Sequence, residues 1–166
     1  MSWLLERLMK HRDDRGMMAN LRCVLVDSKK HRAWPVLSRI GIGIDNQVSA
    51  FIAGLFATHP EPTDKGNFGT ACKFIEYRRD NQTSSDSRLT PTERRFQHLL
   101  ASDTADELYG RIYRMALMAK SNGIQINYSS LEADLNSWRY FKDQIKVKWA
   151  SEFWTPGTVP VNEEDA

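Results

Sequence analysis

Pairs of cationic side chains at helical spacing are the residues of this sequence that could do chemistry, and that chemistry is phosphate binding. Arg111 and Arg114 lie three residues apart, so on a helix their side chains emerge on neighbouring positions along its length. Lys142 and Lys146 lie four residues apart and form a second pair. Such pairs could contact neighbouring phosphates of a nucleic acid without reading its bases.

Side chains that could support catalysis or bind a metal do not form a motif. The four histidines are scattered, and none lies three or four residues from another histidine or a cysteine. No glycine-rich phosphate-binding fingerprint occurs. The acidic residues Asp103, Asp106 and Glu107 lie at the predicted N-terminus of a helix, where the helix dipole favours negative charge, so their presence needs no catalytic role. We therefore predict that the protein is not an enzyme, with no catalytic residue, no metal and no cofactor.

The helices that must position these cations have start signals in the last third of the chain. The run Thr90-Pro91-Thr92-Glu93 predicts a capping box with proline at the first helical position. Ser129 and Glu132 predict a second capping box. Trp138 and Trp149 lie on apolar stripes, so we expect them in the core. The predicted helices cover 94–101 and 103–119, followed by a helix from 129 that bends near 139–141 and ends at 155–157.

The first half of the chain also shows helical periodicity, with no convincing strand pattern and no internal repeat. We expect a basic loop at 28–32, and Trp34 before Pro35 is predicted to be extended. Helices are predicted over 2–11, 17–26, 36–40, 45–57 and 68–77. The polar segment 78–89 is the candidate boundary between two lobes. The expected fold is all-α, with about eight or nine helices in an N-terminal lobe (1–80) and a C-terminal bundle (90–155), followed by a flexible acidic tail (156–166).

Composition and charge fit a globular protein with a basic stripe. Among the 166 residues, 41% are hydrophobic and 27% are charged, which excludes collagen-like, fully disordered and membrane classes. The net charge of +2 conceals a basic N-terminal part, because residues 1–40 hold nine basic and four acidic groups. Cys23 and Cys72 lack metal or disulfide spacing and are expected in the core. No signal peptide is visible, so a cytoplasmic location is the default expectation.

Several of these segments together resemble one known family, the CasB family of small subunits of the type I-E CRISPR Cascade complex. The resemblance is a distributed pattern without a single diagnostic motif, and it is most specific from Glu93 to Trp154. The segments that carry it are Leu21–Arg22, Trp34–Arg39, Glu93–Ala101, Arg111–Arg114, Leu135–Trp138 and Lys148–Trp154.

The resemblance implies a small all-α protein that is not a nuclease and takes part in antiviral defence. It implies contacts with the backbone and large subunits of Cascade, with a second copy of the chain, and with guide RNA and target DNA. In that family, the basic surface holds the target duplex and the displaced non-target strand and so stabilises the R-loop. No membrane and no small-molecule substrate are expected as partners.

The family's phosphate-binding positions correspond to a set of basic residues in this chain. One departure is that Tyr140, Phe141 and Asp143 dilute the basic run after Trp138, where binding is expected to be weaker. The best-matching positions are Arg22, Arg94, Arg95, Arg111 and Arg114. The looser matches are Lys29, Lys30, Arg32, Arg39, Arg139, Lys142 and Lys148.

Two other interpretations stay open from the sequence. Each cationic pair could be a solvated helix face with salt bridges, for example between Arg139 and Asp143. The protein would then be a helical adaptor that binds another protein and makes no direct contact with nucleic acid. A cryptic hydrolase is the third interpretation, and a metal-dependent nuclease assay would detect it.

Overall fold

Capping side chains start the helices of the N-terminal part. The computed structural model describes residues 1–79 and 88–155. Ser2 accepts a hydrogen bond from the Leu5 amide at the start of α1 (Trp3–Lys10), and Asp14 accepts one from Met17 at the start of α2 (Arg15–Arg22). Two 3₁₀ turns, η1 (Cys23–Leu25) and η2 (Lys30–Ala33), then lead into α3 (Trp34–Ile40).

The helix α4 (Gln47–Thr58) is a core helix. All its residues from Ala50 to Thr58 are buried, and it packs on α1, α2, α7 and α8. The hydroxyl of Tyr128, at the start of α8, lies 2.5 Å from the His59 carbonyl oxygen and 3.3 Å from that of Leu55, at the end of α4. The predicted core helix over 45–57 is therefore confirmed, and a buried tyrosine binds the carbonyl groups at its end.

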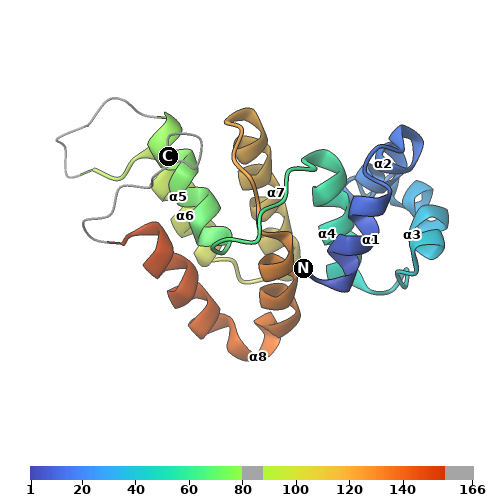
Figure 1. Cartoon of the computed structure of the whole chain (residues 1–166). Helices are drawn as coiled ribbons and strands as arrows, with labels where there is room; N and C mark the ends of the chain where they lie inside the picture. Colours follow the sequence, from blue (N-terminus) through green and yellow to red (C-terminus); the bar gives the residue numbers. More distant parts are fainter. Residues whose placement is uncertain (80–87, 156–166) are drawn as a thin grey trace.

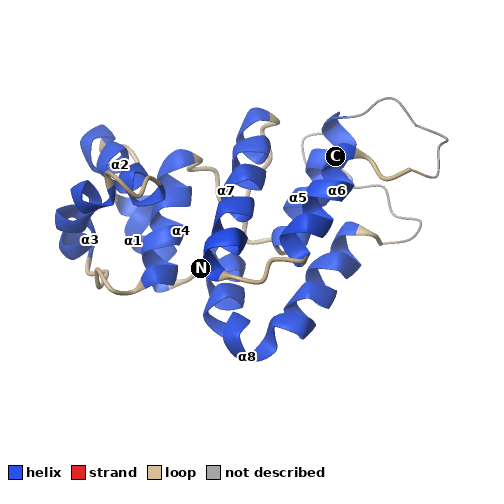
Figure 2. Ribbon diagram, turned by 180° about the vertical axis from the view of Figure 1, so that it is seen from behind, coloured by secondary structure: helices blue, strands red, loops and turns tan. Residues whose placement is uncertain are grey.

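Four further α-helices follow α4 along the described chain. They are α5 (Phe68–Arg79), α6 (Pro91–Leu100), α7 (Ala105–Ser121) and α8 (Tyr128–Phe153). Figure 1 shows α1, α2 and α3 grouped at one end of the molecule and α5 and α6 near the other, with α7 between them. The same arrangement is seen from behind in Figure 2. Within the described residues, the fold is all-α with eight α-helices, as predicted, and there is no strand beyond one bridge between Pro62 and Ile126.

The helix α5 packs chiefly on α8 and also contacts α6 and α7. Gly69 permits this approach, because a Cβ atom there would collide with the carbonyl group of Trp149. These contacts connect the polypeptide on the two sides of the polar segment 78–89. The division into an N-terminal lobe (1–80) and a C-terminal bundle (90–155) stays a prediction.

The helix α8 bends at the predicted place. Phe141 has φ −129° and ψ 24°, outside helical geometry, and the helix continues on both sides of it. Figures 1 and 2 show the bend as an elbow at one edge of the molecule. The first arm buries Leu131 and Leu135, and the second buries Ile145, Trp149 and Phe153 as expected, whereas Trp138 is half-buried and packs against the core. We call the exposed turn at residues 139–142 the α8 elbow.

Some local predictions are confirmed and others are wrong. The Thr90 capping box is present, with both reciprocal hydrogen bonds to Glu93, and Asn122 and Gly123 end α7 as expected. The second capping box is wrong, because Asn127 caps α8 through the Ser130 amide. The hydroxyl of Ser129 instead accepts a hydrogen bond from the Ser2 amide at 3.0 Å.

Three further expectations need correction. Trp34 is helical (φ −56°, ψ −46°) because Pro35 stands in the first turn of α3, where its missing amide hydrogen is not needed. Cys72 is fully buried, but Cys23 is only half-buried in η1, so it is not a core residue. The expected loop at 28–32 enters η2 at Lys30.

Two predicted segments extend beyond the described residues. Most of the polar connection (80–87) and the acidic tail (156–166) lie outside them. Within the described part, no helix has the length and apolar character needed to span a lipid bilayer.

Candidate nucleic-acid interface

A hollow between α6 and α7 gathers three of the predicted cationic side chains. Arg95 lines it from α6, while Arg111 and Arg114 line it from α7. We call it the α6–α7 hollow. Its other lining residues are His98, Met115, Leu117 and Met118.

The buried faces of the two helices fix this arrangement. Phe96 in α6 and Ile112 in α7 are completely buried, Met115 is nearly so, and the two helices pack against each other. Arg95 and Arg114 each stand one residue before a buried side chain, so they lie at the border of the apolar stripe. Hydrophobic packing therefore brings cations from two helices to one place.

Arg111 is held within the protein. Its Nη1 donates to the His98 carbonyl oxygen at 2.7 Å and to Ser102 Oγ at 3.1 Å. The same nitrogen lies 3.7 Å from Glu107 Oε2. Arg111 thereby stabilises the C-terminal end of α6, where carbonyl groups lack helical partners. Glu107 partly offsets its charge.

The other two arginines of the hollow, Arg95 and Arg114, face solvent. Both side chains are exposed, and neither has a hydrogen-bond or ion-pair partner among residues 1–79 and 88–155. The hollow thus combines one oriented guanidinium with two that are available to an anion. A guanidinium binds a phosphate through two parallel N–H···O hydrogen bonds, which suits this arrangement to a phosphate backbone.

Two other predicted site residues make contacts that support the fold. Arg22 donates to the Ala57 carbonyl oxygen near the end of α4 at 3.2 Å. Lys148 pairs with Asp134, a buried carboxylate that also accepts a hydrogen bond from Trp149 Nε1 at 2.8 Å. Arg22 and Lys148 therefore bind groups of the protein itself, as the alternative interpretation of the basic residues expects.

The remaining predicted cations are exposed on several elements. Arg139 stacks over the Tyr140 ring, with its Cζ atom 5.5 Å from the ring centroid, in place of the suggested ion pair with Asp143. Along the chain, these cations form two groups. The N-terminal group is Lys29, Lys30, Arg32 and Arg39, and the C-terminal group is Arg94, Arg139 and Lys142.

Two kinds of lining residue were missed by sequence reasoning, and helical spacing could have found both. His98 follows Arg95 by three residues, and Met115 and Met118 follow Arg111 by four and seven. These intervals place side chains on one face of a helix. A search for residues at these intervals from each cation would have identified them.

Two groups that could serve as nucleophile or base, Cys72 and His59, are engaged in packing. Cys72 is completely buried, and burial raises the pKa of its thiol. The ring of His59 is buried, with Nε2 2.6 Å from the Ile124 carbonyl oxygen. In the part of the chain that the structure describes, no three histidine, cysteine, aspartate or glutamate side chains are grouped to hold a metal ion.

Comparison with known proteins identifies one family. The family described as CRISPR-associated protein Cse2 matches residues 18–154. The fold is similar to that of a Cse2-family CRISPR-associated protein of Thermus thermophilus, with a TM-score of 0.71, 18% identity, and coverage of 92% of this chain and 96% of that one. It is also similar to CasB of M. ruber, with a TM-score of 0.66, 22% identity, and coverage of 93% of each chain. Among curated proteins, none matches this sequence.

Proposed function

Because this chain belongs to the Cse2 family of CRISPR-associated proteins, we propose that it is a non-catalytic nucleic-acid-binding subunit of the type I-E Cascade complex. Family membership supports the role as a Cascade subunit. In our proposal it holds the target duplex and the displaced non-target strand without reading their sequence, and so stabilises the R-loop.

The α6–α7 hollow is the observation that carries this proposal. It joins Arg95, Arg111 and Arg114 from two helices, and two of these guanidinium groups have no partner among the described residues. Cationic side chains that contact only phosphates position a protein on nucleic acid and carry no sequence information. Binding that does not depend on sequence follows from this chemistry.

Modest contacts are sufficient for the proposed role. Opening a duplex against a guide RNA is a near-balanced exchange, because the heteroduplex is about as stable as the duplex that it replaces. A few phosphate contacts on the displaced strand can therefore shift the equilibrium toward the open state. The guide supplies sequence choice, and this subunit needs no catalytic residue.

The other Cascade subunits, a second copy of this chain, guide RNA and target DNA are the proposed partners. The cytoplasm is the proposed location, because the guide and the target are met there. Further phosphates are proposed to contact the exposed cations Lys29, Arg32, Arg39, Arg94, Arg139 and Lys142.

The test uses R-loop formation and single-strand binding by the reconstituted complex across a salt series. Each phosphate contact on a single strand contributes a slope of about 0.7 in log K against log salt, so Arg95→Ala with Arg114→Ala should lower the slope by about 1.4. Arg15→Ala, which removes an exposed cation at the start of α2, is the matched control. An unchanged slope in the double variant, or an equal change in the control, would refute the proposal.

A helical adaptor without nucleic-acid contact is the second candidate. The intramolecular contacts of Arg22, Arg111 and Lys148 favour it, because they show basic side chains engaged by the protein itself. An adaptor would join the complex normally and leave the salt dependence of strand binding unchanged when Arg95 and Arg114 are replaced. The same salt series therefore separates the two candidates.

A further inference from the structure

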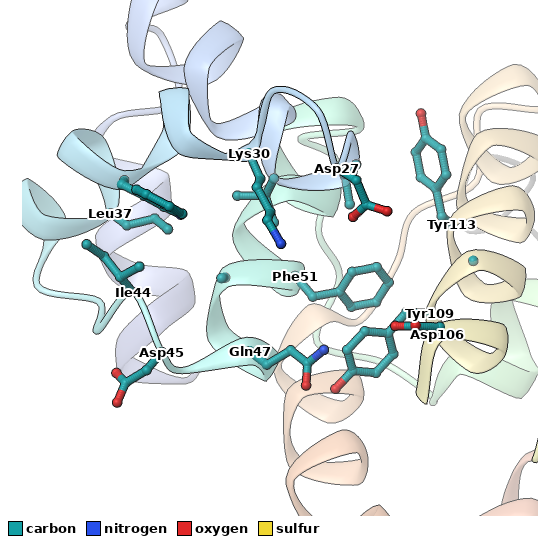
Figure 3. A pocket seen from close by; sticks show the side chains of 15 residues that line it. Asp27, Lys30, Leu37, Ile44, Asp45, Gln47, Phe51, Asp106, Tyr109 and Tyr113 are labelled. Atoms are coloured by element: carbon teal, nitrogen blue, oxygen red, sulfur yellow. The ribbon is translucent and has the colours of Figure 1, made fainter. Parts of the chain in front are cut away.

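A second hollow lies between the N-terminal helices and α7, and its volume is about 520 Å³. We call it the α4–α7 hollow. In Figure 3 the labelled lining residues include Asp27 from the segment between η1 and η2, Lys30 from the start of η2, Phe51 from α4, and Tyr109 and Tyr113 from α7. It is separate from the α6–α7 hollow, with which it shares no lining residue.

An aromatic stack forms a fixed wall of this hollow. Phe51 and Tyr109 lie parallel, with ring centroids 4.4 Å apart and an interplanar angle of 9°. Phe51 is buried, and burial raises the pKa of the Tyr109 hydroxyl, which is therefore a neutral group that can donate or accept a hydrogen bond. Next to it, a Cβ atom added at Gly110 would meet no atom within 4 Å, so the helix surface is open there.

An exposed indole also lines the hollow. Trp34 at the start of α3 is 41% exposed although it lines the hollow, so a large aromatic surface is left uncovered. Tyr113 is half-buried and adds a second ring. Aromatic faces carry a negative quadrupole and attract cations, and a planar guanidinium stacks on them best.

The charges of this hollow favour a cation and disfavour a phosphate. Three carboxylates, those of Asp27, Asp45 and Asp106, line it beside one ammonium group, that of Lys30. Within residues 1–79 and 88–155, none of the three carboxylates accepts a hydrogen bond or forms an ion pair. Carboxylates beside uncovered aromatic rings are the surroundings in which an arginine side chain binds at a protein interface.

We propose that the α4–α7 hollow holds an arginine side chain of a protein partner. The guanidinium stacks on the ring of Trp34 or of a lining tyrosine and donates hydrogen bonds to Asp27 and Asp106. Lys30, a candidate phosphate contact in the sequence, lies here among carboxylates and takes part in a protein interface. The inference does not depend on nucleic-acid binding through the α6–α7 hollow.

The experiment titrates the full chain, labelled with ¹⁵N, with the capped peptide acetyl-Gly-Arg-Gly-amide. The indole N–H of Trp34, assigned with the Trp34→Phe variant, and the amide of Gly110 are followed by NMR. We expect saturable shifts of both signals with the arginine peptide, weaker shifts with its lysine analogue, and none with its glutamine analogue. The double variant Asp27→Asn with Asp106→Asn should raise the Kd about tenfold, as expected for the loss of two solvent-accessible charge contacts.

The controls separate this site from other sources of binding. Asp13→Asn removes an exposed carboxylate outside the hollow and should leave the Kd unchanged. Equal shifts with the arginine and glutamine peptides, or equal affinity of the double variant, would overturn the proposal. A single-stranded oligonucleotide that moves the Trp34 and Gly110 signals would also overturn it, because the hollow would then be a nucleic-acid site.

Discussion

Asp134 joins the two arms of the bent helix α8, and its removal should cost a measurable part of the stability. The carboxylate is 5% exposed, accepts the indole N–H of Trp149 at 2.8 Å and pairs with Lys148. In Asp134→Ala the completely buried indole N–H loses its acceptor, which costs about 1–3 kcal/mol. The ion pair adds at most about 1 kcal/mol, because the Lys148 side chain is 49% exposed and solvent screens it.

The isosteric variant separates these two contributions. Asp134→Asn keeps an oxygen that accepts the indole N–H and loses the ion pair, so it should cost about 1 kcal/mol or less. Asp134→Ala should cost about 1–4 kcal/mol, which lowers Tm by about 2–16 °C for a chain of this length. Urea unfolding followed by tryptophan fluorescence and a thermal scan measure both changes.

The matched control is Asp143, an exposed carboxylate of the same helix without a partner among the described residues. Asp143→Ala should change the stability little, since surface substitutions away from such contacts have small effects. Equal losses for the alanine and asparagine variants of Asp134 would contradict the account, because the indole hydrogen bond would then contribute nothing. Losses no greater than that of the Asp143 control would contradict it entirely.

Three further outcomes are expected from the packing. Gly69→Ala should destabilise the protein by about 3 kcal/mol or more in urea unfolding, because its Cβ atom would collide with the Trp149 backbone. Burial raises the pKa of Glu132, whose Oε2 is buried without a hydrogen-bond partner among the described residues. The protonated carboxyl therefore contributes stability that is complete below the ordinary pKa of 4.5 and is lost as pH rises through the raised pKa. Glu132→Gln should therefore gain stability relative to the natural chain at neutral pH and not in acid. Alkylation of the native protein followed by mass spectrometry should label Cys23 well before Cys72, since burial raises the thiol pKa of Cys72.

Each of these outcomes has a result that would contradict it. Gly110→Ala, where a Cβ atom meets nothing within 4 Å, should instead stabilise α7 by about 0.5–1 kcal/mol, and equal destabilisation at both glycines would remove the collision argument. A stability difference between Glu132→Gln and the natural chain that does not change with pH would show that the raised pKa is wrong. Equal labelling rates for the two thiols would show that Cys72 becomes exposed by local opening.

Local signals in the sequence predicted those features whose partners are close in the chain. The Thr90 capping box was predicted correctly because both of its hydrogen bonds close within four residues. Ser129 carries the same local signal, yet its hydroxyl binds the amide of Ser2, which is 127 positions away in the sequence. A contact of this kind depends on how α1 meets α8, and no short pattern encodes it.

In the candidate site, too, only the contacts between residues close in the sequence were predictable. The spacing of Arg111 and Arg114 placed them together on one helix. Their meeting with Arg95 depends on the packing of α6 against α7, and the role of Arg111 at the end of α6 depends on the position of the His98 carbonyl. The α4–α7 hollow gave no signal at all, because its walls come from segments far apart in the sequence that pack only in the folded chain.

The α8 elbow has a consequence for the isolated segment 128–153. The sequence there contains neither proline nor glycine, the usual causes of a sharp helix kink. We therefore attribute the angle to the packing of α8 on its neighbours, chiefly α5 and α4. A peptide of this segment alone should be straight wherever it is helical, so the angle can serve as a reporter of whether the surrounding helices are docked.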